Sequence, residues 1–187
     1  MTITKNNLLF LLLIILCMTV FSVSAPEDDG AKKVDKIFSD LNSGDPLSGA
    51  DEVSISSADF NSWLAVKTSD KEYIRTITVG FHDENTADLS MDMDIGKVKD
   101  SGYYVTMLST MFEGHQLLKA AGKIRVADGN FSFIINSLSI NEVLVTPALI
   151  VPLIAMLLPD YNLTEPMKLP NGISDIRTSE GVLTITR

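Results

Sequence analysis

The residues best suited to proton transfer or metal binding are the two histidines, His82 and His115. No H-E-x-x-H helix pattern or other metal-ligand spacing surrounds either of them. The sequence also lacks the G-x-S-x-G nucleophile turn, the phosphate-binding G-x-x-x-x-G-K-[ST] loop and the dinucleotide-binding G-x-G-x-x-G. We therefore predict no cofactor and no metal ion, and interpret both histidines as solvated side chains.

Three carboxylates provide the second chemical pattern, because Asp88, Asp92 and Asp94 occupy alternate positions of a predicted strand. Alternate residues of a strand lie about 7 Å apart on one face. Asp92 and Asp94 could therefore flank a ligand, a calcium ion or a glycosidic bond, which would make the protein a hydrolase. The competing interpretation is a solvated strand face opposite an apolar one, and it favours a protein that is not an enzyme.

Methionines suggest a different activity. Met91 and Met93 lie on the apolar face of a strand predicted from Ala87 to Ile95, and Met107 and Met111 share a face of a segment, 103–112, that we expect to be its neighbour. Methionine is flexible and suits surfaces that adapt to variable apolar ligands. These four side chains either line a site for a lipid or fill an ordinary core.

A run without any polar side chain, from Ala148 to Leu158, lies between Pro147 and Pro159. As a helix it would be about 17 Å long, too short to cross a bilayer. An entirely apolar helix must be buried, face a ligand or dip into a membrane. The segment therefore predicts either a core helix or the lining of an apolar site. Its candidate ligand-binding residues are Leu149, Ile150, Leu153, Ile154 and Leu157.

The elements that must position these residues follow from hydrophobic periodicity. Helical spacing predicts a helix over 31–41 and a second helix that carries Phe60, Trp63 and Leu64 after a cap at Ser56 or Ser57. From Lys71 the period changes to two, with Arg75 as an exception, and a change of phase after Ile135 predicts a bulge near Asn136. Turns are expected at 83–85, 128–129 and 180–181. The predicted fold is α+β: a curved antiparallel sheet, a meander, wrapped on two N-terminal helices and one apolar helix.

The N-terminal residues predict export from the cytoplasm. Lys5 precedes an apolar run from Leu8 to Phe21, and small residues end at Ala25, which is the pattern of a cleaved signal peptide. We predict a signal peptide over 1–25 and a single domain over 26–187, which is periplasmic or extracellular. Its acidic character, with a net charge of −9 for the whole chain, predicts repulsion of nucleic acid and of anionic lipid headgroups.

Two segments carry a family resemblance. Residues 55–64 (ISSADFNSWL) have the form of a strand, a Ser/Thr and an acid-x-Asn helix start, and residues 138–147 (LSINEVLVTP) run into the apolar segment. This order resembles small bacterial envelope proteins related to the TULIP-like and LmeA-like lipid-binding proteins. The resemblance implies a curved sheet that wraps a helix and holds acyl chains, with no catalytic residue. It also implies that Asp59–Phe60–Asn61 pins a helix to the sheet.

The leading hypothesis is thus an extracytoplasmic binding domain for an acyl chain or another apolar ligand, without catalysis. Its partner would be a lipid or apolar small molecule, with membrane contact through residues 147–159. The alternative is a protein-interaction or scaffold domain that binds an envelope protein, and the third hypothesis is a hydrolase that uses Asp92 or Asp94.

Overall fold

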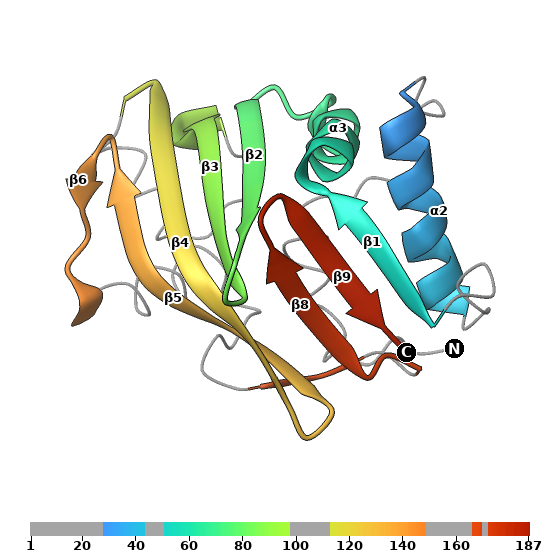
Figure 1. Cartoon of the computed structure of the whole chain (residues 1–187). Helices are drawn as coiled ribbons and strands as arrows, with labels where there is room; N and C mark the ends of the chain where they lie inside the picture. The colour runs from blue at the N-terminus through green and yellow to red at the C-terminus, as the bar shows by residue number, and fades with distance from the viewer. Residues whose placement is uncertain (1–27, 44–50, 98–112, 149–165, 170–171) are drawn as a thin grey trace.

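The computed structural model describes residues 28–43, 51–97, 113–148, 166–169 and 172–187 (Figure 1). Two helices, α2 (Asp29–Ser43) and α3 (Ser57–Thr68), lie side by side at one edge of the molecule. The predicted signal peptide over 1–25 lies outside the described residues. So do Met107 and Met111 in the segment 103–112, and the five ligand-binding candidates between 149 and 157.

The two helices form where their caps and apolar stripes predict them. Asp28 Oδ1 accepts a hydrogen bond from the Ala31 amide at 2.9 Å, so Asp28 caps the start of α2. Ser56 caps α3, because its Oγ accepts a bond from the Asp59 amide at 3.0 Å. The two helices meet through aromatic rings: the ring centroids of Phe38 and Trp63 lie 5.1 Å apart. Both predicted helices are confirmed.

The larger sheet has the strand order β2-β3-β4-β5-β6, with a short β7 paired to β5, and every pairing is antiparallel. Its strands are β2 (Ile74–His82), β3 (Thr86–Asp94), β4 (His115–Ala127), β5 (Asn130–Ile140), β6 (Val143–Leu144) and β7 (Met167–Lys168). A single 3-10 turn, η2 (Ile95–Lys97), follows β3. The predicted turns after β2 and after β4 are confirmed by these bounds.

Two register shifts explain the irregularities of the sequence pattern. In β2, Ile74 pairs with Met93 and Thr76 pairs with Asp92, so Arg75 is an extra, bulged residue. Its side chain therefore does not follow the alternation of inward and outward positions along the strand. In β5, the register passes from Ile135 to Ser137, so Asn136 is the bulged residue, as predicted. Because of this bulge, the apolar residues before and after Asn136 fall on the same face of the sheet.

The smaller sheet has the order β1-β9-β8 and consists of β1 (Glu52–Ser56), β8 (Asp175–Ser179) and β9 (Val182–Thr186). β1 pairs with β9, so the first strand and the last strand of the described chain are neighbours in one sheet. The prediction of one curved sheet is therefore wrong in its count, although the α+β class and the antiparallel pairing are confirmed. The terminal hairpin is confirmed, but its partner strand was not foreseen.

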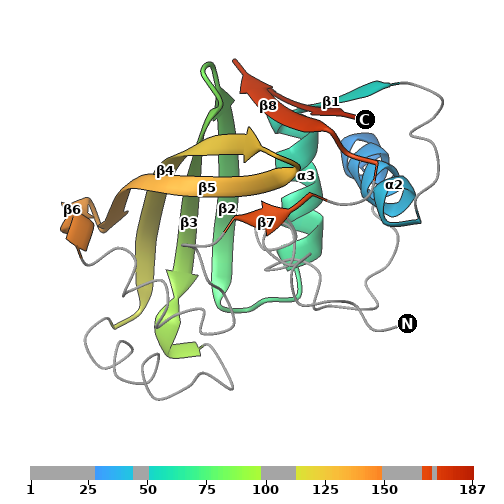
Figure 2. The ribbon, with the colours of Figure 1, turned by 90° about the horizontal axis from the view of Figure 1, so that it is seen from below.

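Hydrogen bonds connect the turn between β2 and β3 both to the smaller sheet and to β4. Asn85, in the turn between β2 and β3, accepts a bond at its side-chain oxygen from the Thr178 amide of β8 at 2.9 Å. Its backbone oxygen accepts a bond from the Ile124 amide of β4 at 2.7 Å. The backbone of Asn85 has a φ of 59°, a conformation that asparagine tolerates better than most side chains. β4 and β5 also bend, so that their far ends lie beside β8 (Figure 2).

We call the two sides of the larger sheet its inner and outer faces. The inner face carries Ile77, Val79 and Phe81 of β2 together with Met91 and Ile124, and these side chains join α2, α3 and the smaller sheet in one hydrophobic core. The outer face carries Asp88 and Asp92 of β3 and the lysines of β4, whose alternation opposes that of the buried residues.

Candidate functional site

The sequence-predicted methionines of β3 both lie on the inner face. Met91 is 9% exposed and belongs to the hydrophobic core. Met93 is partly buried and packs against the same core. The inner face therefore places together the two described methionines of the predicted apolar site.

The apolar inner face continues beyond β3 across β4 and β5. Met91 pairs with Leu118 of β4, and Leu118 pairs with Ile140 of β5, so these three side chains lie in a row across the sheet. Leu138, two residues before Ile140, is buried on the same face but lies outside the hydrophobic core cluster. The inner face thus presents more apolar side chains than the described core includes. The sequence analysis did not name Leu118, Leu138 and Ile140 as site residues. The predicted bulge at Asn136 was a usable signal for the last two, because it places them on the inner face.

The predicted neighbour of β3 is corrected by the pairing. β3 lies between β2 and β4, and residues 86–94 pair with strands on both edges. The segment 103–112 is therefore not the strand beside β3 in the sheet, while Met107 and Met111 themselves lie outside the described residues. The physical reason is that β4, from His115 onwards, supplies a longer alternating strand with a matching apolar face.

Two structural features fix the shape of this face. At Gly122, a Cβ atom would lie 2.5 Å from the Ile134 backbone oxygen and 2.6 Å from Phe133 Cζ, so only glycine permits this close approach at the bulge. At the other edge, Asn61 of α3 binds the backbone of Val79 twice. Its Nδ2 donates to the Val79 oxygen at 3.0 Å, and its Oδ1 accepts from the Val79 amide at 2.7 Å. This contact confirms the predicted attachment to the sheet for Asn61, and the Phe60 ring packs on Phe81 of β2, whereas Asp59 binds Lys33 of α2.

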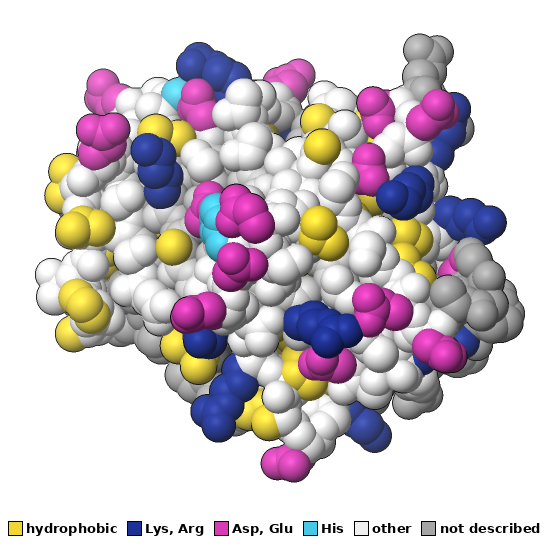
Figure 3. All heavy atoms as spheres, viewed as in Figure 1, with side chains coloured by type: hydrophobic (Ala, Val, Ile, Leu, Met, Phe, Trp, Pro, Cys, Tyr) yellow, Lys and Arg dark blue, Asp and Glu magenta, His cyan; other side chains and the backbone are white. Residues whose placement is uncertain are grey.

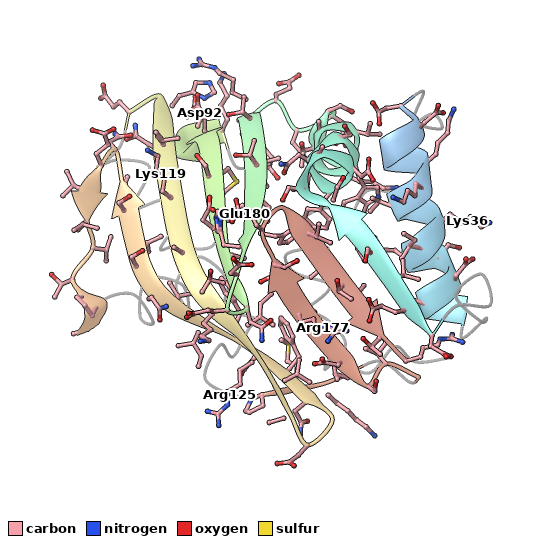
Figure 4. The ribbon with its side chains drawn as sticks, in the orientation of Figure 1. Lys36, Asp92, Lys119, Arg125, Arg177 and Glu180 are labelled. Atoms are coloured by element: carbon pink, nitrogen blue, oxygen red, sulfur yellow. The ribbon has the colours of Figure 1, made fainter. Side chains whose placement is uncertain are left out.

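The outer face holds both histidines, each beside an aspartate (Figure 3). Asp92 lies at the end of the face (Figure 4), where its Oδ2 accepts from Arg75 Nη1 at 3.2 Å and its Oδ1 lies 3.0 Å from His115 Nδ1. Arg75 reaches Asp92 because it is the bulged residue of β2. The carboxylate of Asp92 is thus engaged on both oxygens.

The second histidine, at the end of β2, forms a pair with an aspartate of β3 on the outer face. His82 Nε2 hydrogen-bonds to Asp88, and His82 Nδ1 lies 3.7 Å from Glu180 Oε2. Gly80 makes room for this pair, since a Cβ atom there would lie 2.5 Å from Asp88 Oδ1. The hydrogen bond with Asp88 raises the pKa of His82 above its ordinary value. The side chains of His82 and His115 are 45% and 26% exposed, so both reach solvent as predicted. The sequence did not predict that each of them also has an aspartate as a specific partner.

Asp94, the other carboxylate of the hydrolase hypothesis, pairs with His115 and so lies on the outer face, but it is only 9% exposed. It is buried, and its Oδ1 accepts a bond from the Gly96 amide at 3.1 Å, while Lys97 Nζ lies 3.7 Å from its Oδ2. Asp92 and Asp94 are each bound by neighbouring groups of this chain, and we assign them a structural role.

Within the described residues, no group of three or more histidine, cysteine, aspartate or glutamate side chains is placed to hold a metal ion. Among the helices of the same part of the chain, none combines the length and the apolar character needed to cross a membrane. No protein-family model matches this sequence, and no curated protein matches it either.

Proposed function

We propose that this protein is an extracytoplasmic binding domain for an acyl chain or another apolar ligand, and that it performs no catalysis. The observation that carries the proposal is the apolar inner face of the larger sheet. Met91, Met93, Leu118, Leu138 and Ile140 share this face, and three of them lie outside the described core cluster. Dispersion contacts and the exclusion of water by such side chains are what an acyl chain requires.

The remaining features of the proposal concern residues outside the described part of the chain. The apolar segment 148–158 would form the helix around which the curved sheet wraps, and its leucines and isoleucines would contribute the second wall of the site. The segment 1–25 would direct export and be removed, so that the domain acts in the periplasm or outside the cell. The likeness to TULIP-like and LmeA-like envelope proteins supports this combination of export signal, sheet and apolar helix.

The direct test is native mass spectrometry of the gently purified protein, followed by titration with a fluorescent fatty acid. We expect a bound apolar molecule and saturable binding. Met93→Gln and Leu118→Gln should each weaken the fatty acid about 5- to 30-fold, because burying one aliphatic side chain contributes about 1–2 kcal/mol. A bare polypeptide together with no fatty-acid binding would contradict the proposal.

The matched control is Ile134→Gln. Ile134 lies on β5 of the same sheet but on the outer face, opposite Lys123, and is 48% exposed. The substitution has the same apolar-to-amide character, so it reports any general effect on the sheet. We expect fatty-acid affinity within about twofold of the unmodified protein, since surface substitutions change stability by about 0.5 kcal/mol or less.

A second candidate function, a protein-interaction domain of an envelope complex, is favoured by the end of the sheet. Val143 and Leu144 of the edge strand β6 are 72% and 74% exposed. Exposed apolar side chains at an edge strand suit contact with another molecule. Leu144 pairs with Ser139 and so points away from the inner face. Leu144→Ser should therefore leave fatty-acid binding unchanged and reduce capture of a protein partner, whereas Met93→Gln should do the opposite.

A further inference from the structure

Part of the outer face is basic, although the chain as a whole is acidic. Lys119, Lys123 and Arg125 of β4 are exposed, and their spacing places all three on the outer face. Within the described part of the chain, their side chains take part in no ion pair or hydrogen bond. Figure 4 labels two of them, Lys119 in the first half of β4 and Arg125 near its end. Three cations are thus available to an external anionic group.

Two exposed aliphatic side chains lie among these cations. Ile134 pairs directly with Lys123 and is 48% exposed, and Leu144 of β6 is 74% exposed. Leu144 pairs with Ser139, which pairs with Lys119, so it lies on the same face. We call Lys119, Lys123, Arg125, Ile134 and Leu144 the outer patch. Figure 3 shows hydrophobic and basic side chains together over the edge of the sheet that carries β4 to β6.

The acids of the adjacent strand do not neutralise the outer patch. Asp88, next to β4 in the sheet, is bound by His82, and Asp92 is bound by Arg75 at 3.2 Å. The net charge of −9 acts at a distance, where physiological salt screens it over about 8 Å. Two exposed acids flank the outer patch, Asp128 in the turn after β4 and Glu142 in the turn before β6. The three cations of the patch outnumber them, so the local potential remains positive.

We propose that the outer patch docks the protein on a bilayer surface that contains anionic headgroups. Lys119 and Arg125 are six residues apart, about 20 Å along a strand, a span that covers several headgroups. The cations would contact the phosphates, while Ile134 and Leu144 would reach the acyl boundary beneath them, as apolar and basic side chains do in interfacial proteins. An acidic protein surface would match the cations but not the two aliphatic side chains. This proposal stands apart from ligand binding, because it uses the opposite face of the sheet.

The test is co-sedimentation with vesicles of pure phosphatidylcholine and of phosphatidylcholine mixed with phosphatidylglycerol. We expect binding that depends on phosphatidylglycerol and that falls between about 0.1 M and about 1 M salt. The triple variant Lys119→Gln, Lys123→Gln, Arg125→Gln should lose about 100-fold in affinity, since each cation near an anionic leaflet changes affinity about fivefold. Leu144→Ser should also weaken binding, through loss of its apolar contact.

The matched control replaces Lys32, Lys33 and Lys36 of α2 with glutamine, which changes the net charge equally at the opposite edge of the molecule (Figure 1). Residues 1–27 are identical in all variants, so their contribution to vesicle binding cancels in the comparison. Circular dichroism verifies that each variant is folded. The α2 variant should bind vesicles like the unmodified protein.

Three outcomes would overturn the proposal. The first is equal binding to both kinds of vesicle, and the second is an equal loss in the two triple variants. The third is absence of vesicle binding together with binding of soluble polyglutamate through the outer patch, which would point to an acidic protein partner. Fatty-acid titration of the same variants separates the two functions. The outer-patch variants should bind the fatty acid as the unmodified protein does, whereas Met93→Gln should weaken the fatty acid and leave vesicle binding unchanged.

Discussion

Asn61 provides the most precise test of how the helical layer is attached to the sheet. β2 is an edge strand, and the side-chain amide of Asn61 binds the backbone of Val79 on its unpaired side. The Val79 N–H donates to Asn61 Oδ1 at 2.7 Å, and Asn61 Nδ2 donates to the Val79 oxygen at 3.0 Å. In this position the side chain substitutes for the backbone of a neighbouring strand. Val79 itself is only 2% exposed, so water has poor access to the groups that Asn61 binds.

Asn61→Ala should therefore lower the free energy of unfolding by about 2–4 kcal/mol. Two hydrogen bonds of about 1 kcal/mol each account for the lower figure, and the cost of leaving buried groups unpaired accounts for the upper one. The better helix propensity of alanine offsets only about 0.5 kcal/mol. Asn61→Asp should be at least as damaging at neutral pH, because it keeps the acceptor for the Val79 amide but turns a carboxylate oxygen towards the Val79 carbonyl.

The assay is urea unfolding followed by fluorescence. Trp63 is the only tryptophan of the chain and is 0% exposed beside Asn61 on α3, so its emission reports the loss of this layer. Far-UV circular dichroism gives an independent transition. Ser62→Ala is the control, a change at the adjacent helical position that should alter stability by about 0.5 kcal/mol or less. If Asn61→Ala were as stable as this control, the bond pair would not hold the helix to the sheet.

The remaining predictions concern titration and close packing. Asp88 raises the pKa of His82, so this pair stabilises the protein below about pH 6.5 and the contribution is lost as pH rises through the pKa of the folded state; the melting-temperature advantage over His82→Gln should shrink towards pH 9, and a constant difference would contradict the assignment. Burial acts to raise the pKa of Asp35, but hydrogen bonds from its lysine and indole donors outweigh it and lower that pKa; the advantage over Asp35→Asn should be present above about pH 4 and vanish on further acidification. Gly122→Ala places a Cβ atom 2.5 Å from a backbone oxygen of β5 and should cost about 1–3 kcal/mol in urea unfolding. Gly96→Ala, whose Cβ would meet its nearest neighbour at 3.3 Å, should cost clearly less, and equal effects would show that the close approach at the bulge is unimportant.

Local patterns determined most of the secondary structure of this protein. The helical stripe around Val34 and Phe38, the cap at Ser56 and the alternation of β3 each depend on neighbours within a few residues. Such signals are readable because propensity, capping and periodicity act locally. The same reasoning located the bulge at Asn136, since a change of phase in the apolar pattern requires an extra residue if both parts face one core.

Partner choice between distant segments was decided only by the tertiary structure. The pairing of β1 with β9 joins residues more than a hundred positions apart, and no periodicity distinguishes β9 from any other alternating strand as the partner. Periodicity likewise could not show that β4, and not the segment 103–112, is the neighbour of β3. Side-chain partners across the sheet also depend on register, so the sequence could not predict that His82 and His115 pair with aspartates. Among the described residues, the sequence alone therefore determined the two helices, the longer strands and which strand face is apolar, but not the two-residue strands β6 and β7. Strand order and register, set by the whole core, decided which charged groups meet and which remain exposed.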